Sequence, residues 1–203
     1  MVVVKSKIRA EIVQVARKVF TRNGYRGTTM DEIARSANMG KSTMYYYYQS
    51  KEEIFEAVVV REAQELKKKL ISVISTNKPP RERLKDYILF RLYNIKTMSN
   101  FYAVLKEDYL KQMTFVNRVR KKFEDEEYKM VREILETGIQ NDTFIITNPD
   151  VGAIAFTTML KGLEIPLFLK DYSRTEKEKL LEDLIQVIFY GIVKRNDIPA
   201  NRD

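Results

Sequence analysis

The chain has 203 residues, of which 44% are hydrophobic, so it is long enough to bury a substantial core and is not a disordered segment. It contains no cysteine and no histidine, which excludes disulfides and removes the commonest general base and metal ligand. No apolar run reaches the roughly 18 residues of a membrane span, and the N-terminus lacks the pattern of a secretory signal. We therefore expect a cytoplasmic protein without a metal site or a cofactor.

The net charge of +8 is concentrated at one end of the chain. Residues 1–50 contain nine Lys or Arg and three Asp or Glu, a net charge of +6, which leaves +2 for the rest. A basic first quarter on a nearly neutral remainder is typical of a head that binds a polyanion, attached to a body with another task. A solvated surface with a chance asymmetry is the alternative.

Helical spacing of apolar residues dominates the sequence, and strand-like alternation is almost absent. The first helix is expected over residues 6–22. Thr29 followed by Glu32 forms a capping box for a short second helix over 30–36. After a tight turn, a third helix is expected over 41–48. Two short helices joined by a tight turn indicate a helix-turn-helix.

Six further helices are expected, which makes the protein all-α with nine helices. They span residues 51–75, 81–98, 100–111, 114–140, 149–170 and 175–194. The run RVRKKFEDEEYK, within 114–140, pairs opposite charges at i,i+4. We interpret it as a solvated helix face rather than a binding tail.

The last two predicted helices carry apolar residues in nearly every direction. A helix that is apolar all round must be buried all round, so the pair needs either a large internal core or a second subunit. We favour a second subunit, joined through a two-fold four-helix interface. The expected interface residues are Phe156, Leu160, Gly162, Leu167, Leu181, Ile185, Ile188 and Ile192.

The first quarter of the chain resembles a known family. It contains the run IVQVARKVFTRNGYRGTTMDEIARSANMGKSTMYYYYQSKEEIF. Its Gly-Tyr, its Thr-Thr before Asp-Glu-Ile-Ala and its Lys-Ser-Thr-Met-Tyr are similar to the N-terminal pattern of the tetracycline-repressor (TetR) family of transcription regulators. The resemblance implies a helix-turn-helix DNA-binding head over residues 1–50. It also implies a helical body over 51–203 that binds a small-molecule effector and forms a homodimer.

Four consecutive tyrosines, residues 45–48, end the expected recognition helix. Tyr48 shares a face with Met44 at i,i+4, and the resemblance places that face in the core. Tyr45 is expected to face the major groove, and Tyr46 and Tyr47 to project sideways toward phosphates. With the family's phosphate-binding lysine carried over to Lys51, the expected DNA contacts are Thr28, Thr29, Lys41, Ser42, Thr43, Tyr45, Tyr46, Tyr47 and Lys51.

Aromatic and methionine side chains gather on the middle helices of the body. Such residues more often form plain core, but a buried tyrosine hydroxyl needs a partner that a ligand can supply. The candidate ligand-binding residues are Phe90, Tyr93, Phe101, Tyr102, Tyr109, Met113, Met159 and Leu163. A pocket of this composition predicts an apolar or amphipathic effector rather than a sugar or a nucleotide.

Three classes of function remain open at this point. The leading interpretation is a ligand-responsive homodimeric regulator, most often a repressor in this family, that leaves a palindromic double-stranded DNA operator when its effector binds. A second class is an architectural or division DNA-binding protein of the same fold without an effector. A third is an all-helical enzyme or carrier, against which the absence of His and Cys argues.

Overall fold

The computed structural model describes residues 2–94, 100, 114–169 and 172–191. These residues form eight helices and no strand, so the prediction of an all-α protein is confirmed. The helices are α1 (Val2–Asn23), α2 (Met30–Ser36), α3 (Lys41–Tyr47), α4 (Lys51–Ile74), α5 (Pro80–Tyr93), α8 (Thr114–Gln140), α9 (Pro149–Leu169) and α10 (Arg174–Tyr190). Apart from its first residue, the sixth predicted helix, over 100–111, lies outside the described residues.

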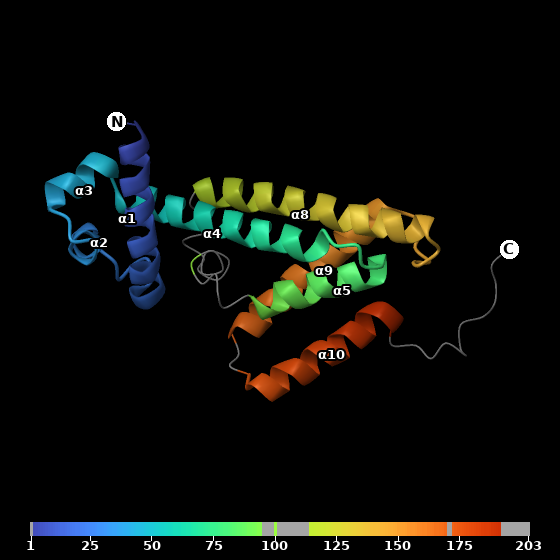
Figure 1. The fold of residues 1–203 in the computed structure, drawn as a ribbon. Coiled ribbons are helices and arrows are strands. Elements are labelled where there is room, and N and C mark those ends of the chain that lie inside the picture. The colour runs from blue at the N-terminus through green and yellow to red at the C-terminus, as the bar shows by residue number, and fades with distance from the viewer. Residues whose placement is uncertain (1, 95–99, 101–113, 170–171, 192–203) are drawn as a thin grey trace.

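Figure 1 shows α1, α2 and α3 gathered into a head at one end of the molecule, and α4 leading from this head into the body. In the body α4 lies alongside α8. Helix α5 packs against both of them and against α9, while α10 contacts α5. Within the described part of the chain, none of the helices combines the length and the apolar content that a bilayer crossing would need.

Local signals set the boundaries of the head helices. Thr29 caps α2, because its hydroxyl accepts a hydrogen bond from the Glu32 amide at 3.2 Å and the Glu32 carboxylate accepts one from the Thr29 amide at 2.8 Å. Asn38, at a φ of 53°, takes the left-handed turn before α3. Gly40 precedes α3 without a side-chain cap, as its lack of a side chain requires.

Helix α4 packs against α1 of the head and against α5 and α8 of the body. Ser50 caps it by accepting a hydrogen bond from the Glu53 amide at 3.2 Å. Near its start, the ring of Phe55 lies 5.0 Å from the ring of Phe20 of α1 and 4.8 Å from that of Tyr25. These edge-on and tilted aromatic contacts stabilise the attachment of the head beyond the burial of apolar area alone.

Helix α8 is more buried than its charge run suggests. Within that run, Phe123 and Glu127 are both buried. Arg91 of α5 pairs with the Glu127 carboxylate at 3.1 Å, and the Tyr87 hydroxyl donates to the same carboxylate at 2.8 Å. The interpretation of the whole run as a solvated face is therefore wrong for these two positions, because α5 covers them.

A tight corner joins α8 to α9. The amide groups of Thr143 and Phe144 both donate to the carbonyl oxygen of Gly138, at 2.7 and 3.1 Å. The Phe144 ring thereby lies directly on Gly138, where a Cβ atom would overlap it. On α9, a Cβ at Gly152 would lie 2.8 Å from Ile146 Cδ1, so this position is also tightly packed.

The exposed face of α9 and α10 differs from the predicted interface. Leu160, Leu181 and Ile185 are buried by the chain's own residues, so they are not available to a second subunit. Phe156 and Ile188 are half-buried and Gly162 is exposed, while the Leu167 side chain and residue Ile192 lie outside the described part. Among the side chains of α9 and α10 that the structure describes, the exposed large apolar ones are Val151, Ile154, Val187 and Tyr190.

Candidate nucleic-acid interface

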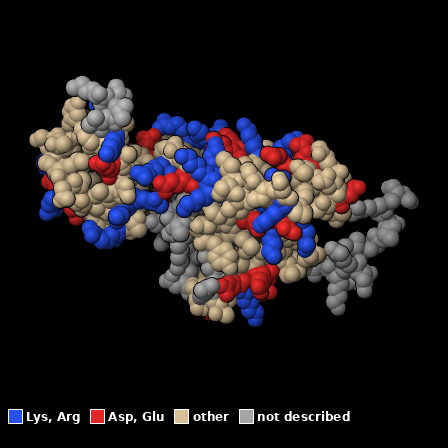
Figure 2. Space-filling view, viewed as in Figure 1, with Lys and Arg blue, Asp and Glu red and all other residues tan. Residues whose placement is uncertain are grey.

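The exposed side of α3 presents hydroxyl groups, phenols and one lysine. Lys41, Ser42, Thr43 and Tyr45 are exposed, and Tyr46 is 64% exposed. Tyr47 is half-buried against the core. In Figure 2 the end of the head formed by α3 is largely uncharged, with Lys and Arg at its margins. Such a surface offers hydrogen-bond donors to base edges and to phosphates.

The opposite side of α3 belongs to the core, as predicted. Met44 is fully buried and Tyr48 is 2% exposed. The Arg9 guanidinium of α1 lies 4.0 Å from the centre of the Tyr48 ring. Burial raises the pKa of the Tyr48 hydroxyl, and the nearby Arg9 charge partly offsets this. Tyr48 therefore stays neutral and fixes α3 against α1.

Lys41 is not free in the unbound protein. Its ammonium lies 3.1 Å from the carboxylate of Asp31 on α2, and this hydrogen bond raises the pKa of Lys41. Both side chains are more than half exposed, so the pair is screened by solvent. Lys41 is therefore charged, and it must exchange Asp31 for a DNA acceptor when the head binds.

The two threonines before α2 have different environments. Thr28 is completely buried, and its hydroxyl donates to the Gly24 carbonyl at 2.7 Å. Its expected contact with DNA does not fit this burial, because the side chain closes the loop between α1 and α2 from within. Thr29 is exposed, but its hydroxyl and its amide are engaged by Glu32. The structure thus gives both threonines a part in shaping the head.

Lys51, the expected phosphate ligand, binds the protein's own backbone. Its ammonium donates to the carbonyl oxygens of Tyr25 and Thr28, each at 2.9 Å, and lies 4.3 Å from the centre of the Tyr25 ring. An ammonium has three donors, so one N–H direction remains. The sequence predicts Lys51 as a DNA contact, which stays a prediction, and it gives no sign of this attachment of α4 to the loop before α2.

A buried polar joint connects the head to α4. Arg17 of α1 donates to Glu62 and to Glu65, both at 2.9 Å, and Glu62 is completely buried. The Asn100 side-chain amide donates to Glu62 at 3.0 Å and to Thr21 of α1 at 3.0 Å. Sequence reasoning missed this joint, because nothing local distinguishes Glu62 from its solvated neighbours.

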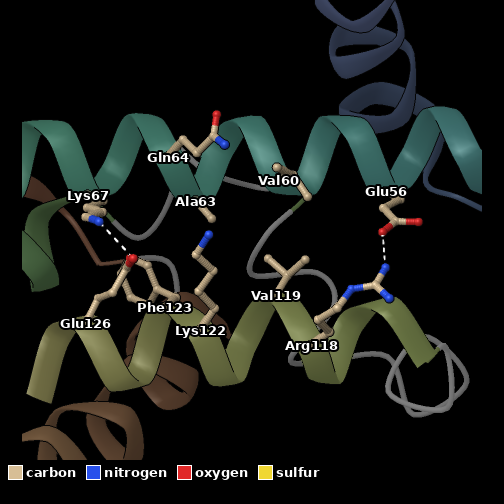
Figure 3. A pocket seen from close by; sticks show the side chains of 10 residues that line it. All are labelled: Glu56, Val60, Ala63, Gln64, Lys67, Arg118, Val119, Lys122, Phe123 and Glu126. Carbon is tan, nitrogen blue, oxygen red and sulfur yellow. Dashed lines mark hydrogen bonds and ion pairs between the residues drawn. The ribbon is translucent and has the colours of Figure 1, made fainter.

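A groove with a volume of about 370 Å³ lies between α4 and α8. Figure 3 shows the side chains that line it. Its floor is apolar and is formed by Val60, Ala63, Val119 and Phe123. An ion pair closes each end, Glu56 with Arg118 and Lys67 with Glu126. Lys122 lies between these pairs and has no carboxylate partner among the described residues. The volume and the apolar floor suit a small ligand.

None of the candidate ligand-binding residues that the structure describes lines this groove. Tyr93 is 43% exposed, so its hydroxyl is not the buried group in need of a partner that the sequence suggested. Phe90, Met159 and Leu163 are half-buried against the core. The remaining candidates, Phe101, Tyr102, Tyr109 and Met113, lie outside the described residues.

Two protein families match successive parts of the chain. Residues 12–58 match the bacterial regulatory proteins of the tetR family. Residues 61–194 match the C-terminal region of QacR-like proteins. The junction of the two matches falls within α4.

Curated relatives and solved structures agree with these matches. The HTH-type transcriptional regulator YhgD of Bacillus subtilis is 28% identical over 152 residues, which cover 75% of this chain and 80% of YhgD. The HTH-type transcriptional regulator QacR of Staphylococcus aureus is 26% identical over 197 residues, which cover 92% of this chain and 99% of QacR.

Among solved structures, a transcriptional regulator from Saccharomonospora viridis in complex with choline has a TM-score of 0.78 at 20% identity, covering 94% of this chain and 100% of its own. This similarity shows the same fold. Because the two family matches together span most of the sequence and the curated relatives are regulators, the chain belongs to the tetR family of bacterial regulatory proteins and is a DNA-binding transcriptional regulator rather than an enzyme.

Proposed function

We propose that this regulator is a homodimeric repressor, which leaves a palindromic operator when an apolar or amphipathic small molecule binds to its body. The observation that carries the proposal is the position of α4. Its first residue, Lys51, holds the loop before α2, and Glu62 joins it to α1. The next residue, Ala63, faces the groove with α8. Within one turn, α4 thus contacts α1 of the head through Glu62 and lines the ligand-sized groove through Ala63.

The head over residues 1–50 binds DNA, and the body over 51–203 binds the effector and the second subunit. Two heads related by a two-fold axis bind successive major-groove faces, about 34–36 Å apart along the duplex. A two-fold protein requires a palindromic operator, because each head reads the same sequence on opposite strands.

The switch works through the movement of α4. Arg17 and Glu62 fix α1 to α4, so the head follows any tilt of this helix. A ligand in the groove presses α4 and α8 apart and changes the separation of the two heads. To weaken operator binding tenfold, the ligand must prefer the separated state by only about 1.4 kcal/mol.

The groove also indicates the chemistry of the effector. An apolar floor favours a hydrocarbon or aromatic group, and the charged rim favours one polar end. The choline complex of the Saccharomonospora viridis regulator supports a small molecule as the ligand of this fold. As a regulator of transcription, the protein is expected in the cytoplasm, where its DNA is.

The dimer forms through the outer face of α9 and α10. On α9, Val151, Ile154, Thr158 and Gly162 are exposed at helical spacing, and none of them is charged. A neutral helix stripe with large apolar residues is typical of a surface that a second subunit covers.

Operator binding with and without effectors tests this function. Duplexes that the protein selects from a random pool should contain a palindrome, and the complex should contain two subunits. A panel of apolar and amphipathic compounds is then tested by calorimetry on the free protein and by titration on the complex. Compounds that bind tightly without changing DNA affinity would contradict the switch. Selected sites without two-fold symmetry would contradict the dimeric repressor.

A further inference from the structure

We propose that Lys5 and Tyr46 together bind a DNA phosphate, so that the start of α1 extends the DNA-binding surface beyond the helix-turn-helix. Helix α1 begins at Val2, four residues before the sequence predicts, and Lys5 also precedes the region that matches the tetR family. This contact presupposes the operator binding proposed above and adds one phosphate ligand to each head.

The first turns of α1 lie beside the C-terminal half of α3. The ammonium of Lys5 is 4.8 Å from the centre of the Tyr46 ring. One turn later, Arg9 donates to the Tyr47 carbonyl and stacks on the Tyr48 ring. Lys5 and Arg9 are spaced i,i+4 and therefore share one face of α1. The contacts of the half-buried Arg9 thus fix the position of the helix that carries Lys5.

Arg9 and Lys5 differ in whether a carboxylate neutralises their charge. Arg9 pairs with the Glu53 carboxylate at 3.0 Å. Lys5 is exposed and pairs with no carboxylate in the part of the chain that the structure describes. The face of an aromatic ring attracts a cation through its negative electrostatic potential. It does not neutralise the charge of the cation, as a carboxylate would. The ammonium of Lys5 is therefore held in place while its charge and its donors remain available to a phosphate.

The position of Tyr46 directs this charge toward DNA. Tyr46 follows Tyr45 on α3 and is 64% exposed, so it lies at the side of the recognition surface rather than in the core. Its ring is held edge-on against the Tyr47 ring at 5.0 Å. When α3 enters the major groove, phosphates line both edges of the groove. The Lys5 ammonium and the Tyr46 hydroxyl can therefore both donate hydrogen bonds to the oxygens of one phosphate.

The salt dependence of DNA binding separates this contact from mere packing of α1 on α3. The probes are a duplex selected from a random pool by the wild-type protein and an unrelated duplex of equal length. Lys5→Gln should make the slope of log K against log[salt] shallower by about 0.9 for each head. At 0.1 M salt it should weaken both duplexes by roughly tenfold or more, since a phosphate contact does not read sequence.

Lys7→Gln is the matched control. Lys7 is also exposed and carries the same charge, but it lies two residues further on, about 200° around the helix, so it faces away from α3. It should leave the slope close to the wild-type value. Tyr46→Leu should weaken binding about as much as Lys5→Gln, and the double variant little more than either, because each removes the same contact.

Circular dichroism melts of these variants should superimpose on the wild-type melt, because both side chains are exposed. A steep wild-type slope that Lys5→Gln leaves unchanged would overturn the phosphate contact while the DNA-binding function stands. Equal loss in Lys5→Gln and Lys7→Gln would also overturn it, since a general charge effect would then suffice. A wild-type protein that selects no duplex would overturn the operator function itself, and this contact with it.

Discussion

Arg17 of the head and Glu62 of the body form an ion pair of 2.9 Å in which the carboxylate is completely buried. The arginine retains partial access to solvent and holds a second carboxylate, that of Glu65, on the next turn of α4. The head is thus attached to α4 by a polar contact of defined geometry as well as by aromatic packing. In the proposed switch, this contact makes the head follow a tilt of α4.

Glu62→Gln should lower the free energy of unfolding by about 2 kcal/mol, because it replaces charge-assisted hydrogen bonds in a buried position. Glu65→Gln, a change at a half-exposed site, should cost no more than about 1 kcal/mol. Urea denaturation of both variants gives the comparison. Equal losses would show that the burial of Glu62 adds nothing to the joint.

Lys51→Ala should affect both folding and DNA binding. It removes the donors to the Tyr25 and Thr28 carbonyls, so the thermal stability of the protein should fall. Affinity should fall alike for all DNA sequences, because the loop before α2 is no longer held and a phosphate donor is lost. If DNA binding weakened with unchanged stability, Lys51 would act on the phosphate alone.

Tyr45→Ala should weaken operator binding and reduce discrimination between bases. Tyr45 is exposed on the same side of α3 as Lys41, where its ring can reach a thymine methyl group. Base preference is measured by selection from a random pool, with Tyr45→Phe as the control that keeps the ring. Unchanged affinity and preference in Tyr45→Ala would move the reading surface to another part of the head.

Ile154→Asp should convert the dimer into monomers, because it places an unpaired charge on the proposed interface. Ile154 is 57% exposed in the single chain, so the monomer itself should remain folded. Ile145→Asp is the control, since Ile145 is 80% exposed in the corner between α8 and α9 rather than on the stripe. Sedimentation velocity of both variants measures whether each is a monomer or a dimer. A dimeric Ile154→Asp protein would place the interface elsewhere.

Acid should weaken the junction between α4 and the loop before α2. The hydrogen bond from the Tyr25 hydroxyl holds the pKa of Glu52 below its ordinary value of 4.5. Because the folded-state pKa of Glu52 is lowered, its carboxylate stabilises the protein at pH values above the ordinary pKa of 4.5. This contribution is lost as the pH falls through the folded-state pKa. Tyr25→Phe should therefore be less stable than the wild type at neutral pH. The difference should shrink in acid, as melts across the pH range will show.

The parts of the fold that the sequence predicts well are those that local interactions decide. The bounds of α2 agree with the prediction because Thr29 and Glu32 cap each other within one turn. The assignment of Met44 and Tyr48 to the core, which rests on their i,i+4 spacing and on the family resemblance, is confirmed by their burial. The DNA contacts predicted on α3 remain predictions, although the exposure of all of them except the half-buried Tyr47 agrees with that role.

Contacts between segments that are distant in the chain could not be predicted from the sequence. Glu127 looks like one more charge in a solvated run, and only Arg91 and Tyr87, about 40 residues earlier, show that it is buried. Similarly, a helix that is apolar in all directions has no periodicity to separate its inner from its outer side. The sequence therefore predicts Leu160 and Leu181 at the dimer interface, although the chain's own packing buries them.

The corner between α8 and α9 restricts which substitutions this protein can accept during evolution. Because the Phe144 ring rests on the backbone of Gly138, even alanine at position 138 would require the ring to leave. A replacement of Gly138 is therefore harmful while Phe144 is present, and it can persist only after the aromatic residue has become smaller. Substitutions at 138 and 144 should consequently arise in a fixed order, which libraries that randomise both positions would reveal.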